Sequence, residues 1–416
     1  MTGLKVLICG AGITGNALAF WLSKMGHHVT VIERYSSLRA TGLQVDLREP
    51  GITVLRRMGL EQQFRAKSVR EQGMEIVDDV GKRKAYFAAN RSGMGMQSFT
   101  TDYEIMRGDL CRLLYDATKD RATFVFGMTV ESFTQRESHV DVEFSDGSHD
   151  QFDLMVGADG QGSRTRRMIL GSEPDPFHPL GVHMGYFTVP REIQPGEEYN
   201  AAIYIAPGRR FIFTRRHSPH AMQVYLACKT DSDRLNKARG NIEEEKDGLA
   251  EVFRGAGWQT DRILKELQSA DDFYCERLGV VRMDSWSAGQ VVLVGDAAYC
   301  PSATTGMGTT SGLVGAYILA GEISKSYQVD FESKDRLLLA LKAYDDTYRP
   351  FMSQVQKGIE KGSTFWDYTP SSSWGITIVH ILLWVAAFLR LDILSQWFIR
   401  EDTTWALPDY KQMEQS

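Results

Sequence analysis

The sequence predicts an α/β fold in which a Rossmann-like unit is joined to a β-sheet domain and a C-terminal helical segment. Three observations predict it. A Gly-x-Gly-x-x-Gly motif lies between an apolar run and a helix-like stretch, two later glycine-and-acid motifs also follow apolar runs, and strand-like aromatic runs fill the middle of the chain. With 416 residues and 43% hydrophobic content, the chain is long enough for two or three domains with sizeable cores.

The first motif contains Gly10, Gly12 and Gly15. In such motifs the first glycine permits a tight turn, the second lets the backbone approach a pyrophosphate, and the third allows close packing of helix on strand. The N-terminus of the following helix favours an anion, because its N–H groups are free and its dipole end is positive. The next apolar strand ends in Glu33, followed by Arg34, and a carboxylate at this place suits the ribose hydroxyls of an adenosine. The sequence therefore predicts that this unit binds a dinucleotide through these five residues.

The second motif, Asp159-Gly160, follows the apolar run 154–158. An Asp-Gly pair after a strand is usually only a turn. Ser163 and Arg166 nevertheless follow it closely, and both are donors suited to a phosphate or to an incoming nicotinamide cofactor. Both interpretations stay open for this motif when it is taken by itself.

The third motif, Gly295-Asp296, ends the apolar run 291–294, and Gly306 and Gly308 then open a helix. Asp296 would accept hydrogen bonds from sugar-alcohol hydroxyls, and the helix N-terminus faces a site of developing negative charge. A reduced flavin needs such a partner. Together the three motifs suit one long dinucleotide held along its whole length, and we interpret it as bound FAD.

The stretches between the motifs predict the remaining elements. An amphipathic helix is expected over 51–67 and another over 110–118. Alternating apolar residues over 122–156, with a hairpin signal at Asp146-Gly147, predict a small meander. Residues 180–230 are predicted to form aromatic-rich strands of a second sheet. One face of this sheet is expected to cover a pocket. Mixed charges at helical spacing predict a solvated helix over 242–253.

These elements divide the chain into three parts, two of them discontinuous. The segments are 1–75, 101–170 and 281–345 for the FAD-binding domain, 76–100 and 171–280 for the substrate domain, and 346–416 for a C-terminal helical region.

Composition excludes several classes of protein. A net charge of −6 gives no electrostatic footprint for nucleic acid. Five scattered cysteines form no CxxC pair, which favours reduced thiols, and neither they nor the histidines have the spacing of a metal site. The chain enters a strand without a charged leader and an apolar signal segment, so a cytoplasmic protein is expected.

One segment raises the question of a membrane. The run Trp374–Leu389 carries no formal charge but is shorter than the roughly 17–25 residues of a spanning helix. A buried closing helix or a subunit contact is the favoured interpretation, and a membrane contact the alternative. The expected oligomeric state is monomer or homodimer, and the sequence does not decide between them.

With these motifs in order, the chain resembles the single-component FAD-dependent aromatic hydroxylases, the family typified by para-hydroxybenzoate hydroxylase. The likeness covers about residues 4–345. Around 295–302 it is most similar to the branch that contains the tetracycline-inactivating monooxygenases. The resemblance implies that Glu33 holds the adenosine ribose, Arg107 the pyrophosphate side, Asp159 and Arg166 the cofactor channel, and Asp296 the ribityl or phosphate linkage, with Pro301 and Gly306 to Gly308 near the flavin ring.

The resemblance also implies a reaction. NADPH or NADH binds transiently and reduces FAD, reduced flavin traps O₂ as a C4a-hydroperoxide, and one oxygen atom passes to an aromatic, phenolic or enolic carbon of a small molecule. A polycyclic, polyketide- or tetracycline-like compound of secondary metabolism is the expected substrate. No protein residue is expected to be catalytic by itself, because the flavin carries the chemistry. A flavin-binding ligand sensor and a non-hydroxylating FAD oxidoreductase are the alternatives.

Substrate is expected between the flavin and the aromatic sheet. The candidate lining residues are Tyr186, Tyr204, Phe213, Arg215 and Tyr225, and the alternative for the aromatic residues is ordinary core packing and for Arg215 a surface charge.

Three positions depart from the commoner family pattern. Tyr299 stands where many relatives have His, Thr309-Thr310 replaces an Asn-containing pair, and Gly315 replaces an Asp. We expect these changes to alter flavin mobility or polarity near the ring and not the fold.

Overall fold

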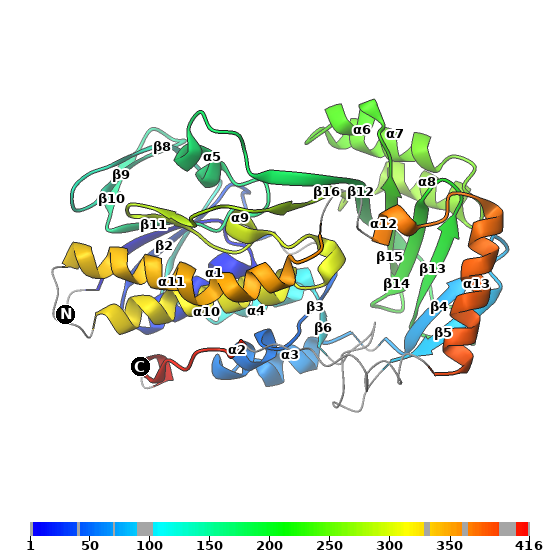
Figure 1. Ribbon diagram of the computed structural model, residues 1–416, viewed down its shortest axis with the longest axis horizontal. Coiled ribbons are helices and arrows are strands. Elements are labelled where there is room, and N and C mark those ends of the chain that lie inside the picture. Colours follow the sequence, from blue (N-terminus) through cyan, green and yellow to red (C-terminus); the bar gives the residue numbers. More distant parts are fainter. Residues whose placement is uncertain are drawn as a thin grey trace.

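Two large β-sheets organise the computed structural model, one in each half of Figure 1. The long paired strands β12 (Phe177–Pro190) and β16 (Tyr274–Val281) run between the two halves (Figure 1). The predicted mixed α/β architecture is confirmed. The structure describes residues 3–39, 42–69, 71–89, 103–327, 333–359, 365–390 and 405–414.

The first sheet has six strands, and all but one pair in parallel. In spatial order they are β17 (Ser287–Ala288), β18 (Val291–Leu293), β11 (Leu154–Gly157), β1 (Lys5–Cys9), β2 (His28–Glu33) and β7 (Thr123–Phe126). Side chains alternate along β1, so that Val6 and Ile8 pack toward the helices while Leu7 and Cys9 pack toward the meander. The sheet is thus buried on both faces, as parallel sheets are.

The helices on the first face come from distant parts of the chain. They are α1 (Ile13–Lys24), α4 (Arg107–Asp116), α10 (Gly308–Ser326) and α11 (Ser333–Val355). The second face is covered by the predicted meander, β8 (Val130–Gln135), β9 (Val140–Phe144) and β10 (His149–Phe152), with a left-handed Gly147 in the predicted hairpin. Short elements complete this half, namely β3 (Gln44–Asp46) paired with β6 (Glu104–Met106), α5 (Arg164–Leu170), α9 (Asp296–Tyr299) and the 3₁₀ turn Ala303–Thr305.

The second sheet has seven strands in the order β16-β12-β15-β14-β13-β4-β5. Its remaining strands are β4 (Gly73–Val77), β5 (Arg83–Ala88), β13 (Asn200–Ala206), β14 (Arg210–Arg216) and β15 (Ala221–Lys229). The expected strands in 180–230 are therefore confirmed. One face is covered by α6 (Asp233–Lys237), α7 (Ile242–Phe253) and α8 (Thr260–Ser269).

Two helix predictions need correction. The expected single helix over 51–67 is two helices, α2 (Gly51–Arg57) and α3 (Glu61–Lys67), because Gly59 takes a left-handed φ of +72° between them. The expected solvated helix α7 buries Leu249 and Phe253 completely against the sheet, so only its outer face is solvated.

The C-terminal part touches both halves. Helix α12 (Phe365–Tyr368) and α13 (Ser373–Phe388) lie against the seven-stranded sheet, while α15 (Lys411–Glu414) returns to α10 (Figure 1). The expectation of a buried closing helix is wrong for α13: Ile376 is buried, yet most of its other apolar side chains are exposed. In the described part of the chain, no helix combines the length and hydropathy needed to cross a bilayer.

Candidate cofactor and substrate site

The turn after β1 is shaped by its glycines. Gly10 has a φ of +112°, and a Cβ there would lie 2.6 Å from the Ala158 carbonyl oxygen. A Cβ on Gly15 would lie 1.9 Å from the Gly10 carbonyl oxygen, so α1 packs directly on the turn. A Cβ on Gly12 would meet no described atom within 4 Å. The fold therefore requires Gly10 and Gly15, whereas Gly12 leaves room at the N-terminus of α1 for another molecule.

Glu33 is fixed at the rim of this room. Its carboxylate oxygens accept hydrogen bonds from the backbone N–H groups of Ala11 at 3.0 Å and Tyr35 at 3.1 Å. Arg34 is exposed beside it and donates to the Tyr35 hydroxyl at 3.1 Å. These residues and Gly12 border one cavity of about 180 Å³. The first motif and the end of β2 thus share a single cleft.

The second motif acts mostly inside the protein. The Asp159 carboxylate borders the cavity but accepts a hydrogen bond from the backbone N–H of Arg164 at 2.8 Å, at the start of α5. Arg166 is fully buried, pairs with Asp175 at 3.0 Å and donates to the Ala297 carbonyl at 2.9 Å. Arg166 therefore joins α5 to α9 and does not border the cavity, whereas Arg164 does.

Arg107, the first residue of α4, connects two hollows. It borders the 180 Å³ cavity and a second hollow of about 20 Å³ against the seven-stranded sheet. Within the described residues, neither a hydrogen bond nor an ion pair occupies its guanidinium. Burial raises the pKa values of Asp296 and Glu276, and the positive charge of Arg107 opposes both rises. Arg107 is thus a free cation at the junction of the two hollows.

The third motif turns sharply against α1. Gly295 has a φ of +69°, and a Cβ there would lie 2.7 Å from the Thr14 hydroxyl oxygen. Asp296 follows as the first residue of α9 and is half-buried. A side chain larger than hydrogen at position 295 would push this turn away from α1, so the glycine sets where the Asp296 carboxylate lies.

The loop after α9 carries the remaining predicted cofactor residues. Pro301 is buried, and the next residue, Ser302, has a φ of +67°, which costs a non-glycine residue roughly 1–3 kcal/mol. Gly306 has a φ of +65° and lies beside the guanidinium of Arg48. Gly308 opens α10, and a Cβ there would meet no described atom within 4 Å. The strained loop therefore ends at a helix N-terminus with open space, as at Gly12.

Two of the three departures from the family pattern explain each other. Tyr299 is buried, and its hydroxyl lies 3.2 Å from that of Tyr344. A Cβ at Gly315 would lie 1.8 Å from the Tyr299 hydroxyl oxygen, so the large residue at 299 requires the small one at 315. Tyr299 belongs to an aromatic core with Trp286 and Tyr348. The other departure, Thr310, uses its hydroxyl to accept a bond from the backbone N–H of Arg48 at 2.9 Å and ties α10 to the loop after β3.

One face of the seven-stranded sheet presents aromatic rings toward the FAD-binding half. Tyr186, Tyr225 and Phe213 lie opposite one another on adjacent strands, with ring centroids 5.2 and 5.0 Å apart. Tyr186 and Tyr225 also border the hollow at Arg107. Tyr204 does not pair with Phe213 across the strands, and its side chain points to the opposite face of the sheet. There its hydroxyl donates to the Ala256 carbonyl at 2.7 Å. The structure therefore brings together three of the four predicted aromatic lining residues and separates Tyr204 from them.

Arg215 is neither a surface charge nor a free group. Its guanidinium forms a double hydrogen bond with Glu71 at 2.7 and 2.9 Å and also pairs with Glu104. The two carboxylates are buried, and the Arg215 side chain is 12% exposed. Burial raises the pKa of Glu104, and the charge of Arg215 opposes the rise. This buried triad joins β14 to β6 and to the chain before β4.

Glu276 is a site residue that the sequence patterns missed. It lies on β16, and its carboxylate accepts a hydrogen bond from the Tyr186 hydroxyl at 3.2 Å. Burial and the negative charge of Asp296 raise its pKa to about 7. The sequence feature that could have identified Glu276 is an acidic residue two positions after Tyr274 in a strand-like run. Arg39 was also missed; it borders both hollows and lies over the Tyr274 ring at 4.5 Å.

Comparison with known proteins agrees with this geometry. Residues 3–357 match the family model described as FAD binding domain. The chain is 49% identical to the FAD-dependent monooxygenase asL4 of Sarocladium schorii, with 99% of each chain covered, and 42% identical to the flavin-dependent monooxygenase eupH of Phoma sp, with 93% of each covered. Among solved structures, tetracycline destructase Tet(51) superposes with a TM-score of 0.78 at 28% identity, covering 99% of this chain and 100% of that one.

The residues present fit FAD. The open space at Gly12, the unpaired Arg107 and the fixed Glu33 carboxylate border one cavity, and the uncapped N-terminus of α1 faces it. An uncapped helix N-terminus and an unpaired guanidinium are suited to a diphosphate, and an oriented carboxylate to ribose hydroxyls. The chain therefore belongs to the FAD binding domain family and is an FAD-dependent monooxygenase.

Proposed function

We propose that the enzyme hydroxylates a polycyclic phenol or enol of polyketide- or tetracycline-like structure, with NAD(P)H and O₂ as co-substrates. The observation that carries the proposal is the aromatic face of Tyr186, Tyr225 and Phe213, which adjoins the cofactor cleft through the hollow at Arg107. Flat, electron-rich rings pack well against such a face. One superposed structure supports the class of substrate, since its name, tetracycline destructase Tet(51), describes an enzyme that destroys tetracycline.

The cofactor end of the site is assigned to residues that the fold holds rigidly. The first turn of α1 at Gly12 and the Arg107 guanidinium would bind the diphosphate, and Glu33 the adenosine ribose. Asp296 and the loop from Pro301 to Gly308 would lie along the flavin side. When bound, FAD supplies electron transfer from NAD(P)H and the activation of O₂.

The substrate end is assigned to groups that orient a ring and handle a proton. The Tyr186 hydroxyl donates to Glu276, whose pKa near 7 lets its carboxylate hold or release a proton at physiological pH. The Tyr225 hydroxyl, 3.0 Å from the side-chain oxygen of Gln223, offers a second polar contact on the same face. We assign Glu276 to accept the proton of a substrate hydroxyl through Tyr186, which makes the neighbouring carbon richer in electrons.

The test is turnover with defined substrates. The purified enzyme is incubated with polycyclic phenols and enols under ¹⁸O₂, once with NADPH and once with NADH. The masses of the products are then measured by mass spectrometry. We expect one compound to accelerate coenzyme oxidation and to gain one ¹⁸O atom. Coenzyme oxidation that every compound leaves unchanged, with hydrogen peroxide as the only product, contradicts the proposed substrate class.

A matched pair of variants tests the assignment of the sheet face. Tyr225→Phe removes a hydroxyl from the aromatic face, and Tyr204→Phe removes one from the opposite face. We expect Tyr225→Phe to change kcat/KM and Tyr204→Phe to leave it unchanged. Equal effects of both changes contradict the placement of the substrate on this face.

A further inference from the structure

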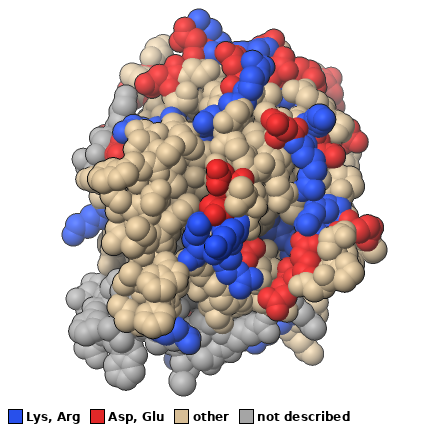
Figure 2. Space-filling view, turned by 90° about the vertical axis from the view of Figure 1, so that its right-hand side faces the viewer, with Lys and Arg blue, Asp and Glu red and all other residues tan. Residues whose placement is uncertain are grey.

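The outer surface of α13 is unusually apolar. Monomeric proteins normally scatter their exposed apolar residues, and contiguous patches beyond a few hundred Å² mark contact sites. Figure 2 shows a broad area without charged residues on the face that carries α13. More than half of the exposed large apolar side chains in the described residues lie on this helix or at its C-cap, namely Trp374, Ile378, Ile381, Leu382, Trp384, Val385, Phe388 and Leu389.

Five of these side chains form a regular seam. Trp374, Ile378, Ile381, Val385 and Phe388 are spaced by four, three, four and three residues, which is the spacing of the contact positions in packed helix pairs. The opposite side of the helix already packs on the sheet through its one buried residue. The seam therefore presents two heptads to solvent with the pattern by which a helix packs against another helix.

The flanks of the seam favour a protein partner over a lipid surface. Interfacial helices usually carry Lys or Arg on their polar face, but the run Trp374–Leu389 has no charged residue. The neighbouring β4–β5 turn exposes Asp79 as well as Lys82 and Arg83. Charges of both signs therefore flank the uncharged helix. A symmetric contact between identical surfaces can pair acid with base across its two-fold axis.

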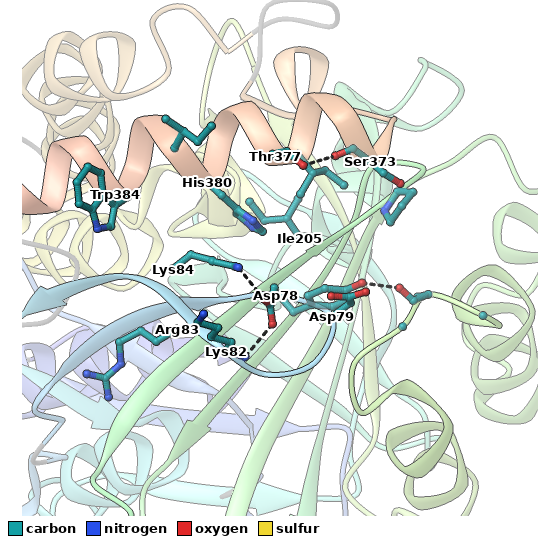
Figure 3. Close-up of a pocket in the computed structure, with 17 residues that line it drawn as sticks. Asp78, Asp79, Lys82, Arg83, Lys84, Ile205, Ser373, Thr377, His380 and Trp384 are labelled. Atoms are coloured by element: carbon teal, nitrogen blue, oxygen red, sulfur yellow. Dashed lines mark hydrogen bonds and ion pairs between the residues drawn. The ribbon is translucent and has the colours of Figure 1, made fainter.

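A groove runs beside the seam. A cavity of about 740 Å³ lies between α13 and the β4–β5 turn, and Ile381 and Trp384 belong both to its wall and to the exposed surface. In Figure 3, Trp384 and His380 project from the helix toward the side of the groove that holds Lys84 and Asp78. Trp384 also stacks on Phe388 with ring centroids 5.5 Å apart. The seam and the groove form one continuous surface with a ridge and a furrow.

We propose that this surface, the α13 seam with its groove, binds the same surface of a second copy of the chain, so that two α13 helices pack antiparallel about a two-fold axis. Ile381 is the midpoint between Trp374 and Phe388 and lies at the axis, facing its own counterpart. The size is of the right order, because a stable interface buries about 800 Å² per partner and eight large apolar side chains on this helix and its C-cap are between 36% and 77% exposed.

Antiparallel packing predicts which cysteines meet. Ile381→Cys is expected to cross-link with itself when the full-length holoenzyme is treated with a short bis-maleimide. Trp374→Cys alone is not, but it cross-links when mixed with Phe388→Cys. Wild type, whose most accessible cysteine is the partly exposed Cys275, and Leu339→Cys, an exposed position on α11, serve as controls. Cross-linking of Trp374→Cys with itself at the yield of Ile381→Cys contradicts the antiparallel arrangement.

The oligomeric state tests the proposal as a whole. In sedimentation velocity at tens of micromolar, wild type and Leu339→Glu are expected at twice the mass of one chain, and Ile381→Glu at the mass of one chain. Unchanged circular dichroism of Ile381→Glu shows that it is folded. A wild type at the mass of one chain overturns the proposal, as does Ile381→Glu at double mass. If the single chain sediments with phosphatidylcholine–phosphatidylserine vesicles, a lipid surface is the partner of α13 instead.

Discussion

The cofactor cleft and the aromatic face of the seven-stranded sheet are built by different means. At the cleft, backbone conformation sets the shape of the site. Gly10 and Gly15 are packed too tightly for any side chain, and Glu33 is held by backbone N–H groups. At the sheet, side chains from distant strands pair with each other, as Arg215 does with Glu71 and Glu104. A site that depends on backbone conformation leaves a local motif in the sequence, whereas a site built from cross-strand pairs does not.

The largest expected effect lies on the sheet side. Arg215→Ala leaves two buried carboxylates without their cation, and breaking such a buried pair costs about 3–5 kcal/mol of unfolding free energy. The control is Arg83→Ala on β5, whose partner Glu75 is in a solvent-exposed pair expected to contribute less than about 1 kcal/mol. Urea unfolding measures both. Equal losses of unfolding free energy in the two variants would show that the triad stabilises the protein no more than the exposed ion pair does.

At the cleft, two glycines three residues apart separate fold from function. Gly15→Ala places a methyl group on the Gly10 carbonyl and is expected to destabilise the protein by about 1–3 kcal/mol and to abolish FAD binding. Gly12→Ala meets open space, so it is expected to leave the melting temperature of the apoprotein unchanged while weakening FAD binding roughly 10-fold, about 1.4 kcal/mol. Differential scanning fluorimetry and FAD fluorescence titration measure the two effects. If Gly12→Ala binds FAD like wild type, the room at Gly12 is not where the diphosphate lies.

The same contrast explains what the sequence could predict. The first two motifs predicted residues that line the cleft, since the spacing around Gly10, Glu33 and Asp159 reflects local backbone geometry. Asp296 of the third motif borders neither hollow, so its role stays a prediction. The cofactor-channel role predicted for Arg166 and the substrate-lining role predicted for Tyr204 stay predictions. Arg166 is paired inside the protein, and Tyr204 faces away from the aromatic rings. For Tyr204, strand register decides which face of the sheet the side chain lies on, and short runs of sequence do not fix the register.

The sequence also could not predict which polar and apolar side chains are buried. Glu276 stands in an ordinary strand, and only its contact with Tyr186 and its nearness to Asp296 make it unusual. For α13, an uncharged run predicted a helix correctly, yet nothing in the run tells which apolar side chains the sheet covers and which remain exposed.

A core pair that joins α9 to α10 has a smaller expected effect. Gly315→Ala sets a methyl group against the Tyr299 hydroxyl and is expected to cost about 1–3 kcal/mol. Tyr299→Phe removes that hydroxyl, so the double variant is expected to be more stable than Gly315→Ala alone. A double-mutant cycle from chemical unfolding gives the coupling energy. Strictly additive losses would mean that the two departures from the family pattern are independent.

The smallest effect concerns pH. Glu276 has a pKa of about 7 in the folded protein against 4.5 as its ordinary value. The folded state therefore binds more protons than the unfolded state between these values, and the contribution of Glu276 to stability falls as pH rises through this window. Glu276→Gln removes the titration, so wild type is expected to lose roughly 1–2 kcal/mol relative to the variant between pH 5.5 and pH 7. Parallel stability curves would show that Glu276 titrates normally.

The most direct measurement is a titration of the apoprotein with FAD, followed by visible absorption and flavin fluorescence. We expect wild type to bind one FAD per chain, Gly12→Ala to bind it weakly and Gly15→Ala not to bind it. A folded wild-type apoprotein that takes up no FAD would contradict this expectation.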